Sequence, residues 1–141
     1  MVGQWGLTYS IAMAIKPHNN GLWTAARYSA FIKGGLRQIS HRWPPKHAVK
    51  KAAWVERGVY QCVGYKKRTH KVKLTIKEKG KTVNNVFVDH INPVVCPAMG
   101  FAGWDEYIDR MFTEADGLQV LCKDCHKRKT ADEREQRKQA R

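Results

Sequence analysis

The Cys-x-x-Cys pair formed by Cys122 and Cys125 constrains the fold of this chain more than any other feature of the sequence. Two cysteines at this spacing are typical of a metal-binding knuckle, in which both thiolates bind one ion. Two more cysteines, Cys62 and Cys96, precede the pair. The apolar-leaning stretch 6–15 is short and no basic run precedes it, so we interpret it as neither a signal peptide nor an anchor. We therefore expect a metal site in a cytoplasmic protein, with a disulfide framework as the weaker alternative.

The charge of the 141-residue chain is unevenly distributed. The chain contains 26 Lys and Arg against 12 Asp and Glu, a net charge of +14. Residues 1–88 hold 17 basic and 2 acidic residues, whereas residues 89–141 hold 9 basic and 10 acidic residues. A basic N-terminal part favours binding to a polyanion, with a solvated basic face as the alternative. No stretch approaches the roughly 18 apolar residues of a membrane span, so we expect no membrane partner.

Two helices are predicted in the N-terminal part. Residues 22–40 have apolar residues at three- and four-residue spacing, which indicates one apolar stripe. A second helix is predicted over residues 45–57, because Pro45 suits the first turn and Gly58 suits the position after the end. Residues 1–20 indicate no definite element. The stripe consists of Tyr28, Phe31, Ile32, Leu36 and Ile39, and we expect Trp5, Trp23, Trp43 and Trp54 to lie in the core rather than to stack on bases.

The C-terminal part has the patterns of strands and of helices, so the chain is predicted to have an α+β fold. Residues 71–77 alternate between apolar and polar positions, the latter mostly lysine. Residues 86–91 are the expected antiparallel partner, after a turn at Lys79-Gly80-Lys81. Further elements are predicted over residues 104–112 (a helix), 118–121 (a short apolar run) and 125–141 (a terminal helix).

Polar residues that could act together occur in two segments of this part. In the first, Asp89 adjoins His90 on a predicted strand, and in the second, His126 follows Cys125. Neighbouring side chains on a strand point to opposite sides, so Asp89 and His90 can share a site only where the strand end twists or bulges. Taken alone, each could be an ordinary residue: a strand-end carboxylate, a surface histidine or a helix cap.

In order and spacing these residues resemble the HNH endonucleases, particularly the phage-encoded kind, over roughly residues 22–131. The resemblance implies a ββα-metal fold, in which a hairpin packs on a helix with one divalent ion between them. We accordingly predict a basic helical DNA-binding arm over residues 1–57 and an HNH nuclease domain with a zinc knuckle over residues 58–141. The matching segments are Trp43-Pro44-Pro45-Lys46, Asp89-His90-Ile91-x-Pro93 and Leu121-Cys122-x-x-Cys125-His126-x-x-Lys129-Thr130.

The resemblance also implies chemical roles. Asp89 and His126 are implied to bind the catalytic ion, Mg²⁺ or Mn²⁺, and His90 to act as the general base. Imidazole can take a proton from water near neutral pH. A hard ion prefers oxygen ligands, keeps several waters and would neutralise charge on the scissile phosphate.

The sequence departs from the family pattern at its central asparagine. That asparagine falls at Gly117, which has no side chain to brace the loop or to contact the metal. Asp116 or Gln119 would have to replace it.

Relatives in this family commonly hold a structural zinc with two Cys-x-x-Cys knuckles, and here the first knuckle is incomplete. Cys62 is followed three residues later by Tyr65. The register of the predicted hairpin places Cys96 beside the missing ligand position. We predict a tetrahedral zinc site with His70 as the reserve ligand, and buried thiols without zinc as the alternative. The predicted ligands are Cys62, Cys96, Cys122 and Cys125.

Basic residues on the helices, a loop and a strand are expected to bind the phosphates of double-stranded DNA. Any single one of them could equally be a solvated charge, so the prediction concerns the surface as a whole. The expected contacts are Arg27, Lys33, Arg37, Arg42, Lys46, Lys50, Lys66, Lys67, Arg68, Lys71 and Lys73.

Together these features predict an endonuclease that nicks or cuts DNA by metal-assisted hydrolysis. We expect a phage homing, nicking or genome-processing enzyme that works as a monomer in the cytoplasm of an infected bacterial cell. The alternative is a zinc-stabilised DNA-binding module that has lost catalysis, which Gly117 and Tyr65 favour. An RNA-binding, ribosome-associated protein fits the charge but leaves Asp89, His90 and His126 unexplained.

Overall fold

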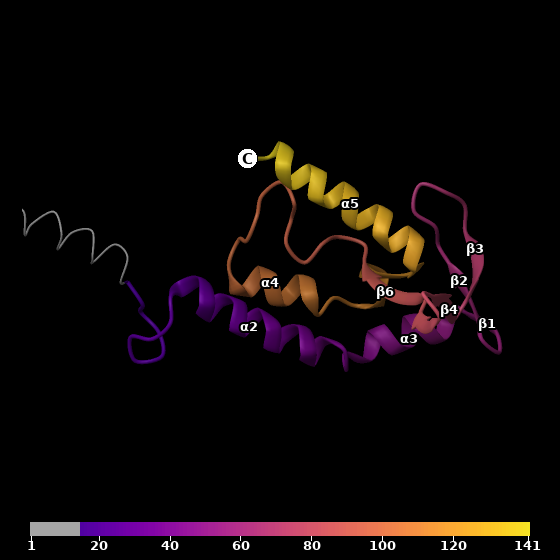
Figure 1. Cartoon of the computed structure of the whole chain (residues 1–141), viewed down its shortest axis with the longest axis horizontal. Coiled ribbons are helices and arrows are strands. Elements are labelled where there is room, and N and C mark those ends of the chain that lie inside the picture. The colour runs from indigo at the N-terminus through magenta and orange to yellow at the C-terminus, as the bar shows by residue number, and fades with distance from the viewer. Residues whose placement is uncertain (1–14) are drawn as a thin grey trace, which may run out of the picture. The chain divides into compact units, whose positions relative to one another are not determined.

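The computed structural model describes residues 15–141, so the predictions for residues 1–14, including Trp5, lie outside the described part. Helices and small antiparallel sheets together make the predicted α+β fold. None of the described helices combines the length and the apolar character needed to cross a membrane. The elements in chain order are α2 (Ala25–Ser40), α3 (Pro44–Ala52), β1 (Trp54–Glu56), β2 (Val59–Cys62), β3 (His70–Lys73), β4 (Thr75–Glu78), β5 (Lys81–Asn84), β6 (Val86–His90), α4 (Trp104–Met111), the 3₁₀ turn η1 (Ala115–Gly117), β7 (Leu118–Cys122) and α5 (Lys123–Gln139) (Figure 1).

The chain divides into two units between Ile39 and Ser40, and α2 makes up most of the described part of the first. This helix confirms the one predicted over residues 22–40, with a slightly later start. Its apolar stripe is not fully buried, because Phe31 is 62% exposed and Ile39 is 50% exposed. Periodicity therefore located the helix, whereas the burial of its stripe depends on packing.

Helix α3 begins at the two prolines that follow Trp43, where a missing N–H costs no intrahelical hydrogen bond. It ends at Ala52, so the prediction of a helix over residues 45–57 is wrong in its last turn. Trp54–Glu56 instead forms β1, an edge strand that pairs with β2. Gly58 has a φ of 74° and reverses the chain between the two strands, a conformation that glycine adopts without steric cost.

Three small sheets replace the single hairpin predicted from residues 71–77 and 86–91. The strand orders are β1-β2-β3, β4-β5 and β6-β7, all antiparallel. The turn predicted at Lys79-Gly80-Lys81 is present, but it joins β4 to β5, so β6 pairs with β7 instead. The predicted pairing is wrong, because period-two alternation identifies a strand without identifying its partner.

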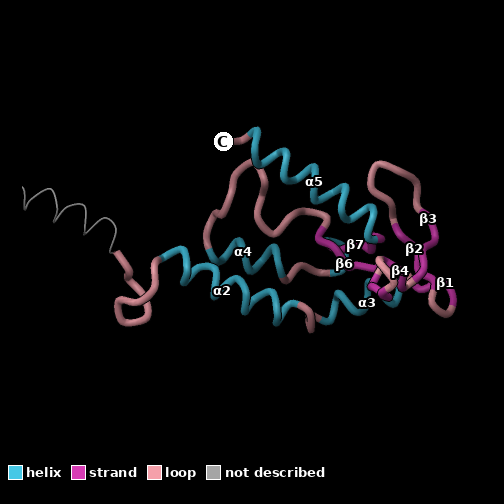
Figure 2. Tube along the Cα trace, in the orientation of Figure 1, coloured by secondary structure: helices cyan, strands magenta, loops and turns pink. Residues whose placement is uncertain are grey.

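The core of the second unit lies around β7, which is buried at four of its five positions. Helix α5 starts directly after β7, and its first turns lie beside the β6–β7 pair (Figure 2). Helix α4 adds Tyr107 and Met111 to the core. Helix α3 contacts both β6 and β7, so it belongs to this second unit. The predicted basic arm, residues 1–57, included α3 and therefore extends beyond the first unit, which ends at Ile39.

The tryptophans expected in the core have different environments. Trp43 is partly buried, its ring lies edge-on to Phe112, and its Nε1–H donates to the Thr113 carbonyl at 2.7 Å. Trp23 is also partly buried. The prediction is wrong for Trp54, which is 55% exposed because it belongs to an edge strand.

Candidate metal centre and candidate active site

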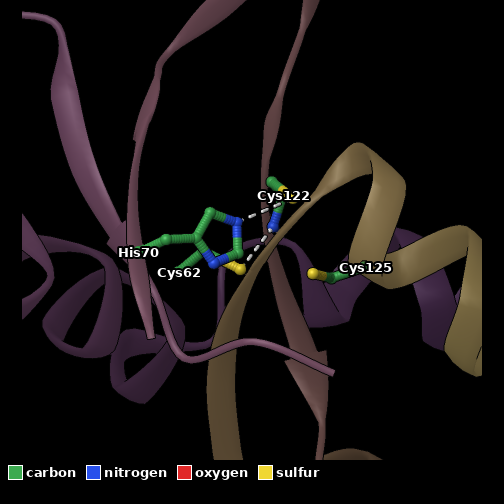
Figure 3. A group of neighbouring side chains, drawn as sticks. All are labelled: Cys62, His70, Cys122 and Cys125. Carbon is green, nitrogen blue, oxygen red and sulfur yellow. Dashed lines mark hydrogen bonds between the residues drawn. The ribbon is translucent and has the colours of Figure 1, made fainter. Parts of the chain in front are cut away.

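Four metal-ligating side chains meet in a group that we call the cysteine cluster: Cys62, His70, Cys122 and Cys125. Cys62 ends β2 and lies opposite His70, the first residue of β3, in the antiparallel ladder. Cys122 ends β7, and Cys125 lies in the first turn of α5. Their ligand atoms all lie within 4.8 Å of one another, and Figure 3 shows the four side chains.

The hydrogen bonds of the cluster orient its imidazole toward sulfur. His70 Nδ1 lies 2.9 Å from the Arg68 carbonyl, and because a carbonyl only accepts, this nitrogen holds the proton. His70 Nε2, 3.6 Å from Cys122 Sγ, therefore presents its lone pair to the cluster. The Cys122 N–H donates to Cys62 Sγ at 3.2 Å. This arrangement is the one expected of an imidazole that binds a metal through Nε2.

The thiols of the cluster differ in acidity. Burial raises the pKa of Cys62 to about 11. Burial acts in the same direction on Cys122, but hydrogen bonds, first of all the one from the Cys125 N–H, outweigh it and lower the pKa of Cys122 to about 7. Thiolates bind zinc, and three sulfurs with one imidazole nitrogen suit a tetrahedral ion. The cluster could therefore hold a metal such as zinc.

The predicted ligand Cys96 does not belong to this cluster. It lies in the connection after β6, where it forms a β-bridge with Gly100. Its predicted position depended on the hairpin that the structure lacks. The actual register of β2 and β3 places the reserve ligand, His70, in the fourth position.

A second group, which we call the Asp89 site, consists of Asp89, Gln119, His126 and Lys129. His126 Nε2 lies 3.6 Å from Asp89 Oδ1. The other carboxylate oxygen, Oδ2, accepts from Gln119 Nε2 at 3.3 Å and from Lys129 Nζ at 3.0 Å. The side chain of Asp89 is 14% exposed and that of His126 is 39% exposed. The carboxylate is therefore mostly buried, whereas the imidazole reaches solvent.

Strand register and helix geometry build this site. Asp89 on β6 lies opposite Gln119 on β7 in the ladder. His126 and Lys129 are three residues apart on α5, so they share one face of the helix. The ring of Phe87 stacks on His126, with a centroid separation of 5.3 Å and an interplanar angle of 20°, and restricts the rotation of the imidazole.

Lys129, which lies three residues after His126 in the sequence, has a side chain that is only 9% exposed. Its ammonium binds Asp89, Glu133 and, at 2.9 Å, the carbonyl of His90. Burial lowers the pKa of Lys129, but its hydrogen bonds with Glu133 and Asp89 outweigh burial and raise it. The spacing of Lys129 from His126 was the only sequence signal for this contact.

The imidazole of His90 hydrogen-bonds with a backbone carbonyl and not with the residues that bind the Asp89 carboxylate. Its Nε2 lies 2.8 Å from the carbonyl of Met111, the last residue of α4. A carbonyl only accepts, so Nε2 holds the proton and Nδ1 of the neutral ring is unprotonated. Alternation along β6 places the side chains of Asp89 and His90 on opposite sides of the strand.

Gly117, where the resemblance would place an asparagine, has no room for a side chain. A Cβ there would lie 2.3 Å from Thr113 Oγ1. Its carbonyl accepts the Ile91 N–H at 3.0 Å, which ties η1 to the end of β6. Of the two proposed substitutes, Gln119 contacts Asp89, whereas Asp116 is exposed in η1.

The basic residues expected to bind phosphate have varied environments. Lys71 and Lys73 are exposed on β3, and Lys67 and Arg68 are exposed in the loop before it. Lys66, in the same loop, forms an ion pair with Asp132 at 2.7 Å. The remaining expected contacts lie in α2 (Arg27, Lys33 and Arg37), in the turn after it (Arg42) and in α3, where Lys46 is half-buried near Ser40 Oγ and Lys50 lies over the ring of Tyr60.

Comparisons of this chain with protein-family models, with curated proteins and with solved structures find no match.

Proposed function

We propose that this protein is a metal-dependent endonuclease of the HNH type that hydrolyses phosphodiester bonds in double-stranded DNA. The supporting observation is the approach of Asp89 and His126, which come from β6 and α5 and lie 3.6 Å apart at a partly exposed position. Two antiparallel strands followed by a helix that lies beside them agree with a ββα-metal core. We include a phage homing, nicking or genome-processing role in the proposal.

The donors of the Asp89 site fit a hard divalent ion. Asp89 Oδ1 is an oxygen ligand of the kind that Mg²⁺ or Mn²⁺ prefers, and His126 Nε2 would add one nitrogen ligand beside it. Gln119 and Lys129 occupy Oδ2 and so turn Oδ1 toward His126. When bound, such an ion would neutralise charge on the scissile phosphate and on the departing oxygen.

His90 has the tautomer that a general base requires. Donation from Nε2 to the Met111 carbonyl orients the ring and leaves Nδ1 able to accept a proton from water. The ring is half-buried, and its partner is a backbone atom, so the orientation does not depend on a mobile side chain. We propose that His90 activates the attacking water through Nδ1, which requires a twist at the end of β6 that brings the imidazole of His90 and the carboxylate of Asp89 to the same phosphate.

Plasmid nicking tests this proposal. Supercoiled plasmid is incubated with the full chain and Mg²⁺ or Mn²⁺, and the relaxed form is measured. His90→Ala and Asp89→Ala should abolish nicking while DNA binding and zinc content stay at the level of the unmodified chain. Asp105→Ala, which removes an exposed carboxylate of α4, is the matched control and should nick normally. Full activity in Asp89→Ala would refute the proposed ion site.

A zinc-stabilised DNA-binding module without catalysis is the second candidate. Two observations favour it: Gly117 leaves no space for the family's asparagine, and Lys129 already binds the Asp89 carboxylate. In the same experiment this candidate predicts retarded plasmid without any relaxed product, whichever divalent ion is added.

A further inference from the structure

A groove outside both groups of ligands lies between α3 and the edge of the β1-β2-β3 sheet. Its volume is about 570 Å³, within the range of ligand-binding clefts. The lining residues are His47, Lys50 and Lys51 from α3, Trp54 from β1 and Tyr60 from β2. Two aromatic and three basic side chains thus share one open groove that no carboxylate lines.

The two aromatic residues are held side by side by the sheet. Trp54 lies directly opposite Tyr60 in the β1–β2 ladder, so both side chains point to the same face. Lys50 Nζ lies 5.7 Å from the centroid of the Tyr60 ring, which brings a cation to the aromatic surface. Trp54 is 55% exposed, and β1 is an edge strand, so the indole is accessible.

This combination of groups matches the chemistry of unpaired nucleotides. A base that has left its stack offers an apolar face that an indole can cover, and every base has such a face. The phosphates on either side of that base require cations, which Lys50 and Lys51 supply. A paired base inside a duplex cannot present its face to Trp54.

We propose that this groove binds an unpaired segment of single-stranded DNA, with a base stacked on Trp54 and the flanking phosphates bound by Lys50 and Lys51. The inference rests on the proposed function only for the choice of DNA as the ligand. It adds a substrate class to that function, namely duplex DNA with an unpaired segment.

Binding measurements without added divalent ion test the groove, because no DNA is then cleaved. The full chain is titrated into a labelled oligodeoxythymidylate and into a labelled duplex of equal length. Trp54→Ala should weaken single-strand binding about tenfold, as expected for one stacked base, and should leave duplex binding nearly unchanged. Trp54→Phe should retain most of the single-strand affinity. Lys77→Ala, an exposed lysine outside the groove, is the control and should weaken both ligands equally.

Several results would overturn the inference, provided that circular dichroism and zinc content match the unmodified chain. These are an unchanged affinity in Trp54→Ala, an equal loss on both ligands, tighter binding of oligouridylate than of oligodeoxythymidylate, or a change in molecular mass that reveals self-association through Trp54. If the chain nicks plasmid but Trp54→Ala does not change single-strand binding, only this inference is refuted. If the chain never nicks plasmid but Trp54→Ala still weakens single-strand binding, only the proposed function is refuted.

Discussion

The cysteine cluster and the Asp89 site both use β7 and the first turns of α5, yet they differ in donor chemistry and in exposure. The three cysteines of the cluster are at most 5% exposed, and its four donors include three soft sulfur atoms. The Asp89 site combines a carboxylate with an imidazole that is 39% exposed. One strand–helix junction therefore presents a closed set of ligands on one side and an open pair on the other.

Under the proposed function, this difference separates a structural role of the cysteine cluster from a chemical role of the Asp89 site. A closed site with four protein ligands leaves no position for substrate, so its ion stabilises the fold. An open site with two protein ligands leaves positions for water and for phosphate oxygens. Substitutions in one group should therefore leave the chemistry of the other intact.

Removing a cluster thiol should have the largest effect. Cys125→Ser should reduce the zinc content from about one ion per chain to none and should prevent folding at 25 °C. The reason is that a structural zinc contributes on the order of 10 kcal/mol, as much as the whole stability of a small domain. Metal analysis and circular dichroism measure both effects.

Cys96→Ser is the matched control, because Cys96 lies outside the cluster. It should keep the zinc and the fold. Loss of zinc in this variant, or a full complement of zinc in Cys125→Ser, would show that the four ligands are wrongly assigned.

Replacing the buried ammonium of the Asp89 site should have the next largest effect. Lys129→Met leaves the carboxylates of Asp89 and Glu133 close together without a cation, which should cost about 3 kcal/mol of unfolding free energy. Denaturant unfolding measures the loss, and Glu133→Gln in the same chain should recover part of it. Lys127→Met, an exposed neighbour, should change stability by less than about 0.5 kcal/mol. If Lys129→Met were as stable as the unmodified chain, the ammonium would not be what stabilises the Asp89 site.

Placing an asparagine at position 117 should harm the open site rather than improve it. Gly117→Asn should destabilise the chain by about 2 kcal/mol, because its Cβ would collide with Thr113 Oγ1. Thr113→Ala in the same chain removes that oxygen and should restore most of the stability. Thermal unfolding and the nicking rate are the measurements, and a higher nicking rate in Gly117→Asn alone would contradict the steric argument.

The smallest effect concerns the loop between β2 and β3, which is tied to α5 on the cluster side. Tyr65 O–H donates to Asp132 Oδ2 at 2.6 Å, and this hydrogen bond raises the pKa of Tyr65 to about 12. The folded state thus favours the protonated phenol, so the stabilisation is present below about pH 10 and is lost as the pH rises through 12. Between pH 8 and pH 11, the unfolding free energy of the unmodified chain should fall more than that of Tyr65→Phe. Parallel slopes would show that the hydrogen bond contributes nothing.

Local patterns in the sequence predicted several elements and three of the four members of the cysteine cluster. Apolar periodicity located α2, and the alternation of β3 and β4 identified extended chain. The spacing of Cys122 and Cys125 indicated their shared site, and His70 was correctly held as a possible ligand. The proximity of Asp89 and His126 was also expected, although their binding of a catalytic ion stays a prediction.

The sequence alone determined the features that depend on residues close together in the chain. Helix period, strand alternation and Cys-x-x-Cys spacing are all local patterns of this kind. The partner of each strand, the replacement of Cys96 by His70, the burial of Lys129 and the exposure of Trp54 were decided only in the folded chain. These depend on which distant segments pack together. One alternating strand can pair with several others at similar local cost, and only the packing of the whole core around β7 selects among them.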